Sequence, residues 1–506
     1  MDQLKEPVVT VWHLQRVLSK KRDPVSHVCF LDVVVKPGAK SLTQLFWSSL
    51  CDVIGQHFSH AYKTHAFLRD TLTEGYPHAL KLFKGLFDSL QSETAIKGVQ
   101  CAVLTGDWEN LQGRLKLYED TYVKASEQRC LDAVASLFSS GRSLPSTEAV
   151  RKVFLARVEQ ELYDVTPSYA GSVRISIVEG ISKAVSNFAE RCEYYIATGS
   201  EARQVQSSAN NAQLRNFSLS SLLQDLHESL LSLPVPQDSV EFLGPAMEKV
   251  YNMAGDCLTP LVRVMMERLE LCLLQVHGEG YHTDEKDTTL PSKYVVDFSE
   301  LLRHFRAEFL QPARLGMAHR SKGSSAIPGL GVALARKMAS RCLVFFVRHA
   351  SMAKPVTEGG KLRLTRDMAE LELCVSQNLF PVEQLGPPYR ALRALRPLLF
   401  LELAAISESP LLQELPLHVV LHHLIARATM DLQMPFERMN LMPAQYSLWL
   451  DEHDEMDAWK GVKACLDAYA KKTTSAGASS FDPVYPIILA LGAKLEKQVT
   501  NAQRGA

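Results

Sequence analysis

Residues 259–276 read TPLVRVMMERLELCLLQV, and their apolar side chains recur every three or four positions. Because an α-helix has 3.6 residues per turn, this spacing places those side chains on one helix face. Thr259 and Pro260 stand in the order typical of a helix start, an N-cap residue followed by a proline at the first helical position. The segment therefore predicts an amphipathic helix with one buried face.

The same periodicity recurs elsewhere in the chain. It is found in Leu222–Leu233, in Phe298–Phe309 and in Leu417–Ile425. Alternating patterns are scarce; Val28–Val35 is the best strand candidate, although a buried helix reads the same over so few residues. Strands and helices do not alternate, which argues against a parallel sheet. The sequence therefore predicts an all-α protein.

Polar and Gly/Pro-rich segments divide the helical pattern. They are residues 141–146, 198–213, 278–292, 321–331 and 472–480. Breaks near 143 and 325 predict three helical bundles, 1–143, 144–325 and 326–506. Since no repeat of fixed period is present, we expect a stack of irregular bundles rather than a regular solenoid.

Composition narrows the class of protein. The chain has 506 residues, 22% charged and 46% apolar, and a net charge of -1. These values are typical of a globular protein, and no overall positive field draws the chain to nucleic acid or lipid. No apolar run approaches the roughly 18 residues of a membrane span, and no signal peptide is present. Ten cysteines without a Cys-x-x-Cys pair predict single reduced thiols. We therefore expect a cytosolic protein.

One segment suggests an enzyme. Residues 343–350, LVFFVRHA, resemble the Arg-His motif of the histidine phosphatase family. There, an imidazole such as His349 is the nucleophile, and a guanidinium such as Arg348 neutralises the phosphoryl oxygens. However, Ala350 stands where that family has glycine, and an apolar helical stripe from Val332 runs into the segment. The pattern therefore favours a helix with Arg348 and His349 near a surface.

Metal sites are weakly indicated. The candidates are His418, His422 and His423, and His57, His60 and His65. Neither set has a further ligand at the spacing of a known zinc motif. The acidic run Asp451–Asp457 lacks the glycine of a calcium loop and instead precedes a predicted helix containing Trp459, as a solvated cap would. We therefore expect no metal.

Cofactor and ligand motifs are equally weak. Gly329 and Gly331 resemble the start of a dinucleotide loop, but no strand precedes them and the third glycine is missing. Phosphate loops and nucleophile elbows are absent, so we expect no cofactor and no catalytic residue. Lys20–Arg22 is a small basic cluster, too small to indicate more than a charged surface.

Several segments together resemble subunit five of the conserved oligomeric Golgi complex. They are His13–Pro24, Val347–Ala350 with Glu358–Leu364, Leu395–Phe400, Tyr446–His453 and Pro483–Pro486. Their order is similar to that of the C-terminal part of this subunit, which a long N-terminal portion precedes in the family. The resemblance implies a fold like that of multisubunit tethering complexes, an elongated stack of helical bundles.

The resemblance also implies a function. It indicates a non-catalytic subunit at the cytosolic face of the Golgi membrane that acts in retrograde vesicle transport and the recycling of glycosylation enzymes. The implied partners are the other subunits, with subunit seven contacted directly, together with SNAREs and small GTPases. Leu395–Phe400, in which Arg396-Pro397 predicts a helix break, and Trp449 are more typical of core than of partner contacts, so partner-binding residues stay unknown. The alternatives are a scaffold or adaptor of another trafficking or coat assembly and, remotely, a phosphoryl-transfer enzyme using Arg348 and His349.

Overall fold

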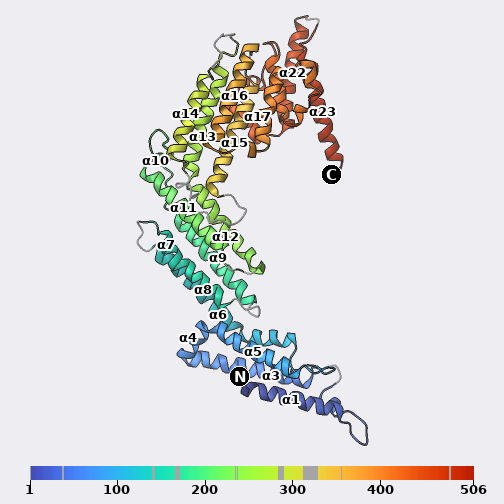
Figure 1. Ribbon diagram of the computed structural model, residues 1–506. Coiled ribbons are helices and arrows are strands. Elements are labelled where there is room, and N and C mark those ends of the chain that lie inside the picture. Colours follow the sequence, from blue (N-terminus) through green and yellow to red (C-terminus); the bar gives the residue numbers. More distant parts are fainter. Residues whose placement is uncertain are drawn as a thin grey trace. The chain divides into compact units, whose positions relative to one another are not determined.

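The computed structural model contains only helices as regular elements in the part of the chain that it describes (Figure 1). The described residues are 2–36, 39–138, 143–165, 171–233, 235, 237–282, 290–311, 329–354, 356–477 and 480–505. Within them, β pairing is limited to an isolated bridge between Arg22 and Cys29. The predicted all-α class is confirmed.

The chain forms two compact units. The N-terminal unit comprises residues 1–195 and 222–253, and the C-terminal unit comprises residues 196–221 and 254–506. The finer division into three bundles at 143 and 325 stays a prediction, and position 325 lies outside the described residues.

The N-terminal unit is built from helices of very different length. They are α1 (Asp2–Lys20), α2 (Phe30–Val34), α3 (Leu42–Thr64), α4 (Ala66–Glu74), α5 (Tyr76–Thr94), α6 (Thr105–Leu137), α7 (Thr147–Ala149), the π-helical turn η1 (Val150–Leu155), α8 (Ala156–Asp164) and α9 (Gly171–Glu193). The indole N–H of buried Trp12 donates to the carbonyl of Gln100 at 2.8 Å, and that of Trp47 donates to Asp107 at 3.0 Å. Both buried indoles are thus satisfied, as buried N–H groups generally are.

Long helix α6 joins the two ends of the N-terminal unit. It packs against α3 and α4 on one side and against α8 and α9 on the other. Buried Glu161 of α8 accepts from Arg129 of α6 at 2.7 Å through both carboxylate oxygens, and from the Ser126 hydroxyl at 2.6 Å. This bidentate, charge-assisted contact fixes α8 on α6.

Val28–Val35, the best strand candidate of the sequence, is not a strand. These residues contain the short helix α2, and none of its side chains is buried. A strand needs a neighbour to accept its backbone hydrogen bonds, and the segments packed here are helices. The apolar run instead lies on the surface.

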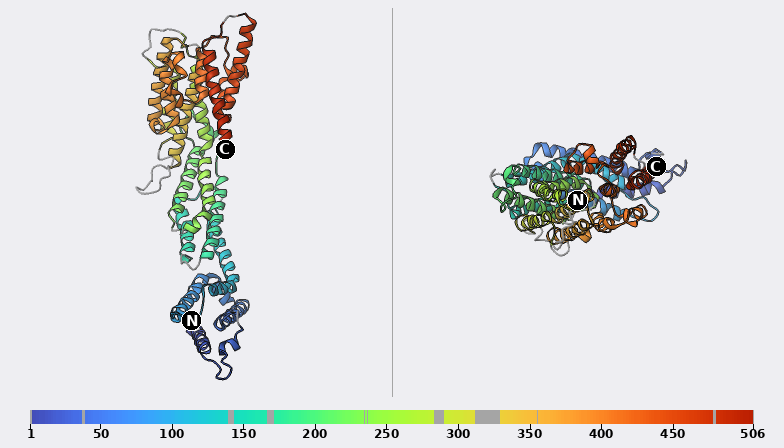
Figure 2. Two further views of the ribbon diagram at one scale, coloured as in Figure 1. Left: turned by 90° about the vertical axis from the view of Figure 1, so that its right-hand side faces the viewer. Right: turned by 90° about the horizontal axis from the view of Figure 1, so that it is seen from above.

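The C-terminal unit contains the remaining helices. They are α10 (Ser200–Arg203), parts of α11 (Asn211–Leu231) and α12 (Gln237–Asp256), α13 (Thr259–Leu273), the 3-10 turn η3 (Leu274–Gly278), α14 (Lys293–Glu308), α15 (Leu330–Ser351), α16 (Glu358–Asn378), η5 (Val382–Gln384), α17 (Pro387–Phe400), α18 (Leu403–Ile406), η6 (Pro410–Gln413), α19 (Leu417–Arg427), α20 (Pro435–Arg438), α21 (Pro443–Glu452), α22 (Glu455–Ser475) and α23 (Val484–Gly505). Helices α13 to α17 run alongside one another in both views of this unit (Figures 1 and 2).

The four apolar stripes of the sequence are confirmed as helices. They correspond to α13, α11, α14 and α19. Four of the predicted loops contain helical residues, which are 200–203 and 211–213, 278, 330–331, and 472–475. The predicted break at Pro397 is also wrong, since α17 continues through it to Phe400. The missing N–H removes one backbone hydrogen bond close to the helix end, where little of the helix remains to be disrupted.

A buried carboxylate joins α14 to α16. Asp367 of α16 is fully buried and accepts from Tyr281 at 2.5 Å, from Tyr294 at 3.2 Å and from the backbone N–H of Ser292, the N-cap of α14, at 2.8 Å. A carboxylate at a helix N-terminus is favoured by the dipole and by the free N–H groups there.

The ten cysteines carry no disulfide, and seven of them are buried. Burial raises the pKa of the Cys51 and Cys130 thiols to about 12. The expected single thiols are confirmed. No helix in the described ranges is both long and apolar enough to cross a bilayer.

Candidate functional site

Helix α15 is the centre of the C-terminal unit. It packs against α13, α17, α19 and η3. Every side chain from Phe345 to Ser351 is buried. The expected helix is confirmed, whereas the expected position of Arg348 and His349 near a surface is wrong, because their helix is surrounded by others.

Arg348 is held by α21. Its Nη1 donates to Asp451 Oδ1 at 2.5 Å and to the carbonyl of Ser447 at 3.2 Å. Asp451 also pairs with Arg341, whose Nε donates to Glu270 of α13 at 2.5 Å. We call these four charged residues, Arg348, Asp451, Arg341 and Glu270, the α15 clamp. The clamp connects α13, α15 and α21 through charge-assisted hydrogen bonds.

His349 points to a different neighbour. Its Nδ1 shares a hydrogen bond of 2.8 Å with Nε2 of His277 in η3, and its ring lies 4.2 Å from that of Phe345. Burial lowers the pKa of His277 to about 4, and burial together with the neighbouring His277, Arg348 and Arg341 lowers the pKa of His349 well below its usual value of 6.5. Both imidazoles are therefore neutral at physiological pH.

The two residues do not face a common substrate position. Consecutive residues of a helix point about 100° apart, as 3.6 residues per turn requires. Arg348 contributes to the wall of a pocket, whereas His349 is fully buried and is not part of that wall. Phosphoryl transfer through histidine needs both groups on one phosphate. The structure does not provide this arrangement.

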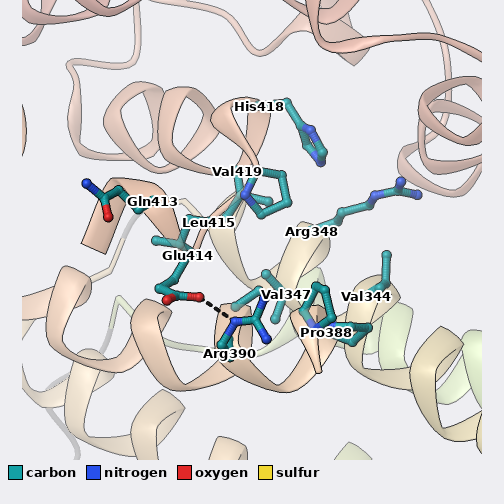
Figure 3. Close-up of a pocket in the computed structure, with 13 residues that line it drawn as sticks. Val344, Val347, Arg348, Pro388, Arg390, Gln413, Glu414, Leu415, His418 and Val419 are labelled. Atoms are coloured by element: carbon teal, nitrogen blue, oxygen red, sulfur yellow. Dashed lines mark hydrogen bonds and ion pairs between the residues drawn. The ribbon is translucent and has the colours of Figure 1, made fainter. Parts of the chain in front are cut away.

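The pocket beside Arg348 lies between α15, the start of α17 and the segment from η6 to α19 (Figure 3). Its volume is about 320 Å³. Its lining combines aliphatic side chains and prolines with Arg348, Arg390, Glu414 and His418. Arg390 and Glu414 form an ion pair of 2.6 Å at the wall. A mainly apolar pocket with a few polar groups is the usual form of a binding site for a small ligand or a partner's side chain.

His418 is the most constrained polar group of this pocket. Its Nδ1 bonds to Oε1 of Glu455 at 2.6 Å, and its backbone N–H donates to Oε2 at 2.9 Å. Burial by itself raises the pKa of Glu455, but the contacts with His418 and the charge of Arg348 outweigh burial and lower it. The opposite nitrogen, Nε2, is buried without a partner among the described residues. The same holds for Nε of Arg348, so two residues that line the pocket each carry a buried nitrogen without a hydrogen-bond partner in the described part of the chain.

The other histidine candidates are separate side chains. His422 and His423 are buried, and His422 Nε2 bonds to the Tyr446 hydroxyl at 2.9 Å. By contrast, His57, His60 and His65 are exposed. No group of three metal-ligating side chains that could hold an ion is found in the described ranges.

The glycine pair lies at the beginning of α15, and the acidic run joins the end of α21 to the beginning of α22. Gly329 is the N-cap of α15, and Gly331 is in its first turn. Asp454 caps α22 by accepting from the backbone N–H of Asp457 at 2.8 Å, which confirms the predicted cap. The sequence did not predict that Asp451 belongs to the clamp or that Glu455 accepts hydrogen bonds from His418. The signal was available in part, because Arg341 and Arg348 are seven residues apart and share a helix face.

The structure thus defines an all-helical protein in which the charged residues of α15 join helices to one another. Comparisons identify its relatives. Residues 1–87 match the family model described as conserved oligomeric Golgi complex subunit 5, C-terminal. The chain is 41% identical to "Conserved oligomeric Golgi complex subunit 5" of Arabidopsis thaliana, over 98% of this chain and 60% of the relative. It is 27% identical to the protein of the same name from Mus musculus, over 99% of this chain and 63% of the relative. The chain is therefore similar to subunit 5 of the conserved oligomeric Golgi complex, and the resemblance seen in the sequence is confirmed.

The match has a defined extent. The chain spans about three fifths of the length of these curated relatives. Among solved structures, the exocyst component Exo70p of S. cerevisiae covers 97% of this chain at 12% identity, with a TM-score of 0.27. A superposition this weak carries no argument about the fold.

Proposed function

We propose that this chain is a non-catalytic subunit of a Golgi vesicle-tethering complex that acts in intra-Golgi retrograde transport and thereby in Golgi organisation and glycosylation-enzyme recycling. The observation that carries the proposal is the 41% identity to a subunit of this name along 98% of the chain. Identity spread over both units supports a common architecture rather than one shared motif. The proposed location is the cytosolic face of the Golgi membrane, where the protein is peripheral, and the cytosol.

The arrangement of α15 supports a role without catalysis. The residues with the strongest chemical signal in the sequence, Arg348 and His349, are engaged in contacts between helices. In a scaffold, charges of this kind fix the register of neighbouring helices, which is one attested use of buried polar groups. The proposed function therefore explains their presence without a substrate.

The proposed partners are the other subunits of the same complex, with subunit seven in direct contact, together with SNAREs and small GTPases. A tether needs reach, which helices supply at about 1.5 Å per residue. Grooves and pockets between helices, such as that beside Arg348, accept side chains of partner helices.

Affinity purification of the tagged chain from cells, followed by mass spectrometry, tests the proposal. We expect the other subunits of the Golgi complex to be recovered, led by subunit seven, and a tagged helical protein of similar size to recover none. Recovery of the subunits of a different coat or trafficking assembly would replace this proposal with the adaptor alternative.

A second measurement covers the case in which the chain alone assembles weakly. Cells depleted of their own subunit 5 are supplied either with this chain or with this chain joined to the N-terminal portion of a relative. Lectin staining of surface glycans then reports on enzyme recycling. We expect the joined protein to restore staining; failure of both proteins to do so, with both well expressed, would contradict the proposal.

A further inference from the structure

The N-terminal unit carries a cluster of exposed apolar side chains at the end of α1. Its members are Val17, Val25, Val28, Phe30, Val33 and Val34, which we call the apolar tip. Val25 is 89% exposed and Val33 is 71% exposed. Single exposed apolar residues are ordinary, but a cluster on one short segment indicates contact with another apolar phase.

The tip is a folded feature of the chain. The backbone N–H of Asp23 donates to Val28 at 3.0 Å, and that of Phe30 donates to Lys21 at 3.1 Å. The Asp23 carboxylate accepts from the backbone N–H groups of Val25 at 3.0 Å and Ser26 at 2.7 Å. These hydrogen bonds lower the pKa of Asp23 and fix the turn after α1. A defined backbone therefore holds the apolar side chains in water. Their exposure is unfavourable in free energy unless another apolar phase covers them.

Positive charge surrounds the tip. Four exposed cations lie in this segment, namely Lys20, Lys21, Arg22 and Lys36, whereas only two carboxylates, those of Asp23 and Asp32, are present. None of the four cations forms an ion pair with a carboxylate in the described part of the chain, while Asp23 is occupied by its turn. A chain with a net charge of -1 thus has a local positive field at the exposed apolar side chains of the tip.

We propose that the apolar tip and its four cations bind the surface of an anionic lipid bilayer. Aliphatic side chains enter the boundary between headgroups and acyl chains, while lysine and arginine remain at the headgroups. The shape supports a bilayer over a peptide, because the most exposed member, Val25, lies in a turn beyond the C-terminal end of α1 and Val33 lies in the short helix α2 that follows (Figure 1), whereas peptide helices are bound in grooves. This inference goes beyond the proposed function and does not depend on it, since it requires no other subunit.

Vesicle flotation of the purified chain tests the inference. The probes are vesicles of phosphatidylcholine alone and vesicles containing about one third phosphatidylserine, at low and at physiological salt. We expect flotation with the anionic vesicles, weakened by salt because exposed charges are screened. Each lysine near a charged leaflet changes partitioning roughly fivefold, so Lys20→Ala with Lys21→Ala lowers it by about 25-fold. Val25→Ser with Val33→Ser lowers it also, but with an unchanged dependence on salt.

The chain provides a matched control. Lys63→Ala with Phe67→Ser removes a cation and an apolar side chain that is 78% exposed, from the junction of α3 and α4 in the same unit. This variant keeps the flotation of the unaltered chain. Since all six altered residues are exposed, each variant retains the thermal midpoint of the unaltered chain.

Three results would overturn the inference. They are absence of flotation with anionic vesicles at low salt, equal flotation with neutral vesicles, and equal loss in the tip and control variants. Analytical sedimentation of the protein without vesicles tests whether a second copy of the chain covers the tip instead. If the chain is a dimer that the Val25 and Val33 substitutions dissociate, a second copy covers the tip, and the bilayer does not.

Discussion

Removing the carboxylate of Asp451 is the sharpest test of the α15 clamp. Asp451 accepts from Arg348 at 2.5 Å and also pairs with Arg341. The side chain of Arg348 is only 10% exposed, while that of Asp451 is 32% exposed. Asp451→Asn keeps the size of the side chain but leaves a buried guanidinium without its counter-charge.

The magnitude follows from this burial. Removing one partner of a fully buried ion pair costs about 3–5 kcal/mol, because the remaining charge is uncompensated. Water reaches the Asp451 side of the pair, and Arg348 retains its bond to the Ser447 carbonyl. We therefore expect Asp451→Asn to lower the free energy of unfolding of the C-terminal unit by about 2 kcal/mol. The C-terminal unit has about 280 residues. With an unfolding entropy of about 2.1 cal/mol/K per residue, this loss corresponds to a fall in Tm of about 3–4 °C.

Calorimetry of the full chain measures this change. Asp431→Asn is the matched control, because Asp431 pairs with Lys472 at 2.6 Å but both side chains are more than 60% exposed. We expect no resolvable shift from it. Arg348→Met with Asp451→Asn removes both partners, so the double variant is more stable than the sum of the single losses predicts. A wild-type Tm for Asp451→Asn, or an equal loss for Asp431→Asn, would refute the clamp.

Three further predictions address packing, titration and catalysis. Gly492→Ala lowers the free energy of unfolding in urea, because a Cβ at this position overlaps the buried indole of Trp459. Gly461→Ala raises it by about 1 kcal/mol, because alanine favours helix α22 and its Cβ makes only an ordinary contact at 3.9 Å. A change of the same sign in both variants would contradict this prediction. Burial lowers the pKa of His423 to about 3, below the 6.5 of an unfolded imidazole, so the stability linked to this group is complete above pH 6.5 and falls as the pH drops towards 3. His423→Leu therefore reduces the slope of unfolding free energy between pH 6 and pH 4 by about 1.4 kcal/mol per pH unit, and an unchanged slope would disprove the assignment. We expect the unaltered chain and His349→Ala to hydrolyse p-nitrophenyl phosphate no faster than buffer alone. Hydrolysis by the unaltered chain that His349→Ala abolishes would support the phosphatase alternative instead.

The periodicity of apolar residues predicted the principal helices of the fold. The stripes in Leu222–Leu233, 259–276, Phe298–Phe309 and Leu417–Ile425 all lie on helices. They could be predicted because the apolar residues of each buried face recur at the helical period within one segment. Val28–Val35 failed for the opposite reason: it is short, and its β-branched residues lie on the surface. Over so few residues, composition cannot separate a strand from an exposed helix.

The site was much less predictable. Arg348 and His349 were recognised as a pair, but their separate orientations depend on Asp451 and His277, which lie far from them in the sequence. Likewise, the acidic run was expected to be a solvated cap, which holds for Asp454. Its neighbour Glu455 instead accepts from His418 at 2.6 Å. Periodicity describes each helix alone and contains no information on which helix lies beside it.

The sequence by itself determined the all-α class, the principal helices and the relationship to subunit 5, because these depend on local spacing and on segments of ordered residues. Only the tertiary structure decided that the charged residues of α15 join α13 and α21, and that the apolar residues after α1 are left uncovered. Both outcomes depend on packing between distant segments: a charge is buried where a partner's counter-charge meets it, and an apolar face stays exposed where no other helix reaches it.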